Sequence, residues 1–157
     1  MNKPQLFGVL VAAAPVLAMG WAGVATATPI STGPVPLGTR EVTELTGFTS
    51  PSGNIGCYID PSYVRCDIRE RDWSPPPRPA SCPDVTGYGQ GVEVNVGKPA
   101  TFVCAGDTAL GGGDPLAYGD TIVAGSIECT SLPEGMRCWD FQYGGEFTIS
   151  REGYQLA

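Results

Sequence analysis

The sequence contains no histidine, and Lys98 is the only lysine after residue 27. Without an imidazole there can be no Ser–His or Cys–His pair, and Asn95 stands where a Ser-x-x-Lys motif ending at Lys98 would need serine. Neither a Gly-x-Ser-x-Gly elbow nor a phosphate-binding loop is present. These absences exclude the common nucleophilic enzymes. We therefore predict no catalytic residue and no cofactor, and we favour a non-enzymatic protein.

Positive charge is also scarce. Nine Lys and Arg residues stand against sixteen Asp and Glu residues, which gives a net charge of −7. A nucleic-acid-binding protein needs a basic face, and an anionic membrane surface would repel an acidic chain. We therefore predict no nucleic-acid partner and, once an N-terminal signal has been removed, no stable membrane insertion.

The first 27 residues have the pattern of a secretory signal peptide. Lys3 lies near the start, an uncharged apolar run covers residues 6–25, and Ala25–Ala27 forms a small-residue cleavage site. Removal of residues 1–27 takes away Lys3 and no acidic residue, so the net charge changes from −7 to −8. The alternative is an uncleaved anchor, because the run is long enough to span a bilayer. We predict a protein that is secreted, extracellular or held in the cell envelope.

The rest of the chain divides into a linker and one domain. Residues 28–46 are rich in Thr, Pro and Gly and are predicted to be an extended linker, and residues 47–157 form the domain. No window in the domain has the periodicity of a helix. Short apolar runs predict strands instead: NIGCYI, YVRCDI, VEVNV, ATFVCA, TIVAG, SIECT, MRCWDF and EFTIS. The fold class is therefore all-β, a small disulfide-braced sandwich or barrel of short antiparallel strands.

All six cysteines follow the predicted signal peptide: Cys57, Cys66, Cys82, Cys104, Cys129 and Cys138. An even number in a short exported chain indicates disulfides, and the lack of histidine and of any Cys-x-x-Cys pair argues against zinc. Six cysteines allow fifteen pairings. If Cys57 faces Cys66 in an antiparallel hairpin, Pro61-Ser62 forms the tip and the apolar residues share one face. The same register joins Cys129 to Cys138, which leaves Cys82 for Cys104.

The two cysteine hairpins share the pattern G-x-I-x-C-x3-P-x3-R-C, with an offset of 72 residues. Six identities in fourteen positions favour an internal two-fold repeat of a clasped hairpin. The alternative is convergence, because turn chemistry and disulfide geometry select the same residue types.

The segments SPSGNIGCYI, VRCDI, FVCAGDT and FTISREGY, with these cysteine spacings, resemble a family of small secreted proteins of actinobacteria, including mycobacteria. The resemblance covers about residues 47–157. It implies export and a disulfide-braced domain. The family is known as a domain of unknown function, so the resemblance assigns no site residue.

The candidate binding residues are Trp73, Asp107, Trp139 and Tyr143. Aromatic rings beside carboxylates can stack on sugars or anchor a protein partner, although in a small domain they can equally belong to the core. Trp73 precedes the run Pro75–Pro77, which is either a protruding loop or a rigid crossover. Asp107 either contributes to a site or closes a turn after its strand.

A calcium site built from Asp107, Asp114 and Asp120 is a weaker alternative, because their spacing does not match an EF-hand loop. The leading functional hypothesis is a secreted or envelope-associated binding module for an extracellular protein or an envelope glycan. A carboxylate-dependent hydrolase of envelope polysaccharide is the first alternative, and its mark would be two acids facing each other in a cleft. A secreted protease inhibitor is the second alternative.

Overall fold

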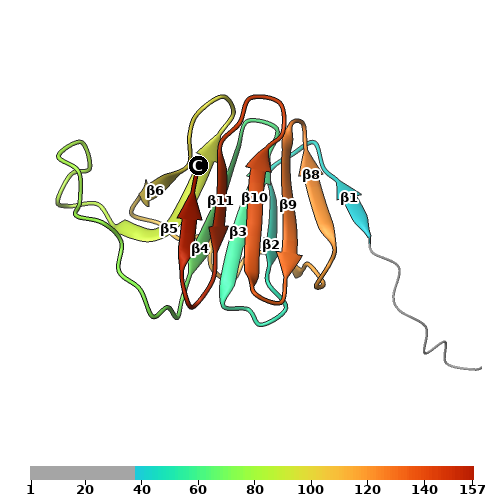
Figure 1. The fold of residues 1–157 in the computed structure, drawn as a ribbon, viewed down its shortest axis with the longest axis horizontal. Helices are drawn as coiled ribbons and strands as arrows, with labels where there is room; N and C mark the ends of the chain where they lie inside the picture. Colours follow the sequence, from blue (N-terminus) through green and yellow to red (C-terminus); the bar gives the residue numbers. More distant parts are fainter. Residues whose placement is uncertain (1–37) are drawn as a thin grey trace, which may run out of the picture. The chain divides into compact units, whose positions relative to one another are not determined.

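The computed structural model describes residues 38–157, so the predicted signal peptide and the first part of the predicted linker lie outside the described residues. This part of the chain contains no helix, and hence no helix that could cross a membrane. Twelve strands form two six-stranded sheets (Figure 1). In spatial order, sheet A consists of β1 (Thr39–Glu41), β8 (Thr121–Ala124), β9 (Ile127–Leu132), β10 (Gly135–Asp140), β11 (Glu146–Ile149) and β12 (Tyr154–Leu156). Sheet B consists of β6 (Thr101–Cys104), β5 (Tyr88–Asn95), β4 (Tyr63–Ile68), β3 (Ile55–Asp60), β2 (Thr46–Thr49) and β7 (Asp114–Pro115).

The prediction of an all-β, disulfide-braced fold is confirmed, and of its two architectures the structure shows a sandwich. The eight predicted strands correspond to β3–β6 and β8–β11. Buried and partly exposed residues alternate along β9 and β10, because one face of sheet A packs on sheet B. The buried apolar side chains of both sheets form one core cluster. Neither sheet closes into a barrel.

The disulfides brace the centre of each sheet. Cys57 bonds to Cys66 between β3 and β4, and Cys129 bonds to Cys138 between β9 and β10, as the hairpin register predicts. The two hairpin disulfides meet across the core, where the Sγ atoms of Cys66 and Cys138 are 3.9 Å apart. The third bond joins Cys82 to Cys104.

The topology confirms the internal repeat. Strands β2–β6 are connected in the same order as β8–β12, and the clasped hairpins β3–β4 and β9–β10 occupy equivalent places. The first strand of each half pairs with the other half. β1 runs parallel to β8, and β7 runs parallel to β2. Each half therefore contributes an edge strand to the sheet of the other half.

This exchange affects the segment that the sequence assigned to a linker. Residues 39–41 of that segment form β1, and Thr46 begins β2. All three residues of β1 are exposed, so the strand has no apolar alternation for a sequence pattern to detect. Its position depends on backbone pairing with β8, some 80 residues later in the chain.

Candidate functional site

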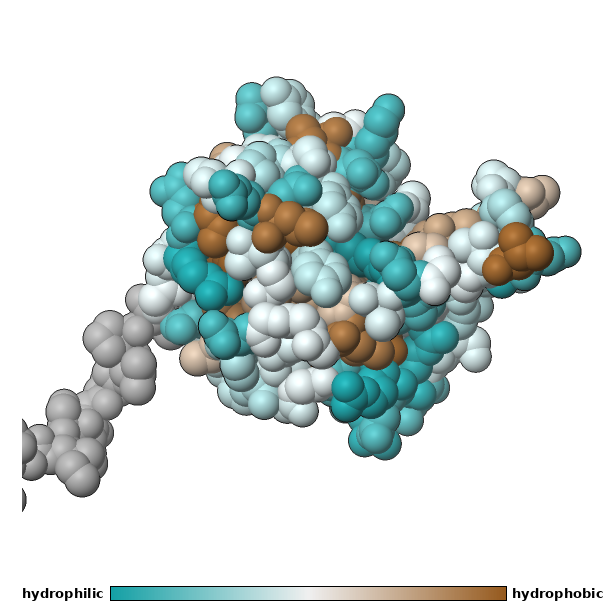
Figure 2. Space-filling model, turned by 180° about the vertical axis from the view of Figure 1, so that it is seen from behind, coloured by the Kyte–Doolittle hydropathy of each residue, from teal (hydrophilic) through white to brown (hydrophobic). Residues whose placement is uncertain are grey.

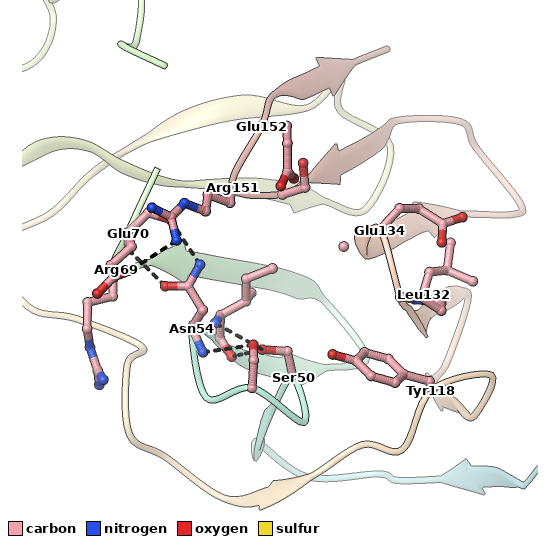
Figure 3. A pocket seen from close by; sticks show the side chains of 14 residues that line it. Ser50, Asn54, Arg69, Glu70, Tyr118, Leu132, Glu134, Arg151 and Glu152 are labelled. Atoms are coloured by element: carbon pink, nitrogen blue, oxygen red, sulfur yellow. Dashed lines mark hydrogen bonds and ion pairs between the residues drawn. The ribbon is translucent and has the colours of Figure 1, made fainter. Parts of the chain in front are cut away.

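Loops that connect the strands enclose a cavity of about 390 Å³ (Figure 3). One wall is the β2–β3 loop, whose conformation is fixed by its own hydrogen bonds. The Ser50 hydroxyl accepts a hydrogen bond from the Ile55 amide at 3.1 Å. The Asn54 side chain exchanges two hydrogen bonds with the backbone of Glu70, at 2.9 and 2.8 Å. This wall therefore presents hydroxyl and amide groups from a rigid loop.

The facing wall comes from sheet A. It includes the tip of the second clasped hairpin, Leu132–Gly135, and the β11–β12 turn at residues 150–152. Gly135 has φ of +147°, and a Cβ there would lie 2.4 Å from the Ile149 carbonyl oxygen, so only glycine allows this approach. The turn is closed by hydrogen bonds between Ser150 and Gly153.

The charges around the cavity are mixed. Arg151 pairs with Glu70 at 3.4 Å and with Asp72 at 3.5 Å. Among the described residues, Glu134 and Glu152 take part in no ion pair. Tyr118 is 47% exposed, and Figure 3 shows its ring together with Glu134 and Glu152 around the open centre of the cavity. Carboxylates, hydroxyls, an amide and an aromatic ring thus converge on one concave surface.

The sequence prediction missed this cavity. Its lining comes from five separate segments, and none of them contains a recognisable binding or catalytic motif. The only local signal was the tip Pro133-Glu134, which the hairpin register placed at an exposed turn. Tyr118 and Glu152 come next to that tip through the folding of sheet A, and no sequence pattern predicts that proximity.

A second concave surface lies at the edge of the sandwich. It is an apolar groove of about 500 Å³ between the proline-rich segment and strands β6 and β12. Trp73 packs beside it, with ring centroids 4.8 Å from Tyr154 and 6.1 Å from Phe102. Its indole N–H donates to the Ser150 carbonyl at 2.8 Å. Trp73 thus contributes to the packing that joins the crossover segment to both sheets.

Asp107 lies in the loop between β6 and β7, on the outer side of sheet B. Arg65 donates to its carboxylate at 2.7 Å and to its carbonyl oxygen at 2.8 Å. The hydrogen bond and the charge of Arg65 lower the pKa of Asp107. Arg65 is itself buried and makes a bidentate ion pair with Asp67. In this position Asp107 anchors the loop to the sheet.

Figure 2 shows the sheet B side of the protein, where hydrophilic and hydrophobic residues are interspersed. The segment between β4 and β5 projects from the edge in both views and carries Val85, which is 97% exposed. On the opposite side, Trp139 lies on the outer face of sheet A, with the Arg137 guanidinium 4.8 Å from its ring centroid. Tyr143 is 60% exposed in the β10–β11 loop.

The four predicted binding residues are therefore spread over different surfaces. None of them lines the cavity of Figure 3. The three aspartates weighed as a calcium site have separate surroundings: Asp120 accepts from the Gly38 amide at 2.8 Å, and Asp114 lies in β7. Within residues 38–157, no group of three or more acidic, cysteine or histidine residues is placed to hold a metal ion.

Residues 38–157 match the model of a family of unknown function, DUF6636, and the chain belongs to that family. Comparisons with curated proteins and with solved structures gave no match.

Proposed function

We propose that this DUF6636 protein is a non-enzymatic binding module, secreted or associated with the cell envelope, that binds a glycan in the cavity of Figure 3. Three disulfides in a chain of this length are typical of an oxidising, extracytoplasmic compartment. The Cys129–Cys138 bond also closes the hairpin whose tip, Leu132–Gly135, lines the cavity, which reduces the ordering cost of binding there.

One observation carries the proposal: Tyr118, Glu134 and Glu152 lie around one open cavity and form no ion pair or hydrogen bond with any described side chain. A carboxylate oxygen accepts hydrogen bonds from the hydroxyl groups of a sugar, and an exposed aromatic ring stacks on the C–H face of the sugar ring. Ser52 and Asn54 add neutral polar groups on the wall formed by the β2–β3 loop. This combination suits an uncharged polyhydroxyl ligand.

The hydrolase alternative concerns the same cavity, because three glutamates line it. A glycosidase requires one carboxylic acid in apolar surroundings to donate a proton to the leaving group. Glu70, Glu134 and Glu152 are all exposed to solvent, and Glu70 pairs with Arg151. The cavity gives none of them the buried environment of a general acid, which favours binding over turnover.

The test is a titration of the disulfide-bonded protein with soluble oligosaccharides prepared from bacterial envelope polysaccharide, followed by amide chemical shifts. We expect shifts at residues 50–54 and 132–135, and a loss of affinity of about tenfold in Tyr118→Ala, the effect of one stacked ring. Tyr143→Ala is the matched control, because that ring is more exposed and lies outside the cavity. It should bind as the native protein does.

Equal affinity in Tyr118→Ala and native protein, or shifts confined to other surfaces, would contradict the proposal. Release of reducing ends during the titration would establish the hydrolase instead. In that case the release should disappear in Glu134→Gln or Glu152→Gln, while oligosaccharide binding persists.

A further inference from the structure

The side chains on the outer face of sheet A form two cross-strand rows. In a sheet, paired residues on neighbouring strands point to the same side. The first row is Thr39, Thr121, Thr130, Arg137, Thr148 and Gln155. The second row is Glu41, Val123, Glu128, Trp139 and Glu146. In Figure 1 this face is turned toward the viewer, and no described segment crosses it.

The equivalent face of sheet B is covered by the chain itself. There the row that corresponds to Glu128, Trp139 and Glu146 is Gly56, Asp67 and Gly91. A Cβ on Gly56 would lie 2.4 Å from the Ala109 carbonyl oxygen, so the glycine allows the β6–β7 loop to rest on the sheet.

In sheet A, glutamates stand where these glycines stand in sheet B. Side chains of that size would keep a covering loop of the same kind away from the sheet. The outer face of sheet A therefore differs from its counterpart in having a row of large side chains that remains open to solvent.

Arg137 shows how a cation is held on this face. Its guanidinium lies 4.8 Å from the Trp139 ring centroid, and its Nε donates to Glu146 at 2.7 Å. The hydrogen bond to Glu146 raises the pKa of Arg137, and the charge of Glu128 contributes in the same direction, which places Glu128 within electrostatic range. Within the described residues, the two Nη groups of Arg137 and the Glu128 carboxylate have no hydrogen-bond partner among side chains.

Glu128 and Glu146 flank Trp139 directly, one on each neighbouring strand. Arg137 donates its side-chain hydrogen bond to Glu146, whereas the Glu128 carboxylate, on the other neighbouring strand, bonds to no described side chain. Glu41 adds a third carboxylate in the same row. Three carboxylates against one guanidinium make the face acidic, and a cation between a ring and a carboxylate gains both cation–π and charge-assisted hydrogen-bond energy.

We propose that the outer face of sheet A docks a basic polypeptide, with an Arg or Lys side chain seated between Trp139 and Glu128 as Arg137 is seated beside Glu146. The partner is an extended segment, because the two rows cross six and five strands and the first row offers threonine hydroxyls along its length. This surface is distinct from the cavity of Figure 3.

The test uses a synthetic peptide of alternating Gly and Arg, and a matched peptide in which citrulline replaces Arg. Citrulline retains the planar group and removes the charge. Binding is followed at 20 mM and 300 mM NaCl through the Trp139 indole N–H resonance, assigned by its absence from Trp139→Phe. We expect the Arg peptide to shift this resonance at low salt, a weaker effect at high salt, and no effect of the citrulline peptide.

Three variants test the location. Glu128→Gln should lower the affinity for the Arg peptide about fivefold or more, since it removes the charge that receives the guanidinium. Asp84→Asn removes one exposed charge in the segment between β4 and β5, outside this face and outside the cavity, and should bind within about twofold of the native protein. Arg137→Gln frees Trp139 and Glu146 and should raise the affinity for the Arg peptide.

Failure of the Arg peptide to shift the Trp139 indole at 20 mM NaCl would overturn the proposal. Equal weakening of binding by Glu128→Gln and Asp84→Asn would overturn it as well, because net charge alone would then explain the binding. Weaker binding of the Arg peptide by Arg137→Gln would mean that Arg137 supports the peptide and does not compete with it for Trp139, and this too would refute the proposal.

Discussion

Replacing Asp67 by alanine should destabilise the protein more than any other change of a single charge. The Asp67 carboxylate is fully buried and accepts two hydrogen bonds from Arg65, at 2.9 and 2.8 Å. It also accepts from the Thr108 hydroxyl at 3.0 Å and from the Ala109 amide at 2.9 Å. Its removal leaves a guanidinium that is only 9% exposed without its main partner. Breaking such a pair costs about 3–5 kcal/mol, a large share of the ~5–15 kcal/mol of a typical domain.

The measurement is the free energy of unfolding in urea, with the disulfides intact. Asp107→Ala is the matched control. It removes the other carboxylate bonded to Arg65, but that side chain is 80% exposed, so the loss should be clearly smaller. In Arg65→Met/Asp67→Ala the buried guanidinium that lost its main partner is gone as well, and part of the stability should return. The reasoning is refuted if Asp67→Ala costs less than about 1 kcal/mol, or if the double variant is less stable than Asp67→Ala.

Three further features can be tested by unfolding in the same way: the Cys57–Cys66 disulfide, the buried Asp140 carboxylate and Trp73 in the proline-rich segment. Cys57→Ser/Cys66→Ser should lower the unfolding free energy by about 2–3 kcal/mol, the loop-closure value for ten residues, and an unchanged melting temperature would contradict this bracing role. Asp140 is buried, which raises its pKa, but hydrogen bonds from backbone amides outweigh this and lower the pKa overall. The Asp140 carboxylate therefore adds its full share to the free energy of unfolding above its unfolded pKa of about 3.9, and this share is lost as the pH falls through the folded pKa. In Asp140→Asn, the free energy of unfolding should depend less on pH below about pH 4. Trp73→Phe loses the hydrogen bond to the Ser150 carbonyl and part of the aromatic packing, so it should cost about 1–3 kcal/mol in the same urea assay.

Much of the fold could be predicted from local signals. Alternating valines, the turn at Pro61-Ser62 and the spacing of the cysteines determine central strands whose register is set within a hairpin. Strands β1, β2, β7 and β12 were missed because they are only two to four residues long, and most of their residues are at least partly exposed. Two of them pair in parallel with strands from the other half of the chain. Such pairing depends on the folded arrangement and leaves no periodicity in the sequence.

The candidate sites were harder to predict for the same reason. Aromatic residues and acids could be identified by type, but their surroundings depend on which segments meet. The sequence offered Asp107 as a site residue or as a turn residue after its strand, whereas the structure fixes it through Arg65, a residue 42 positions earlier. The cavity around Tyr118 has no counterpart in any continuous stretch of sequence.

The two repeat arginines show how a duplicated pattern acquires two different roles. Arg65 and Arg137 occupy the same position of the shared pattern and point outward from equivalent strands. Two positions later the first copy has Asp67 and the second has Trp139. Asp67 pairs with Arg65, which lies buried beneath the β6–β7 loop and stabilises the fold. Trp139 instead contacts Arg137, which stays on a solvent-exposed face. The exchange of Asp67 for Trp139, together with glutamates in place of the flanking glycines, thus separates a structural ion pair from a solvent-exposed surface suited to recognition.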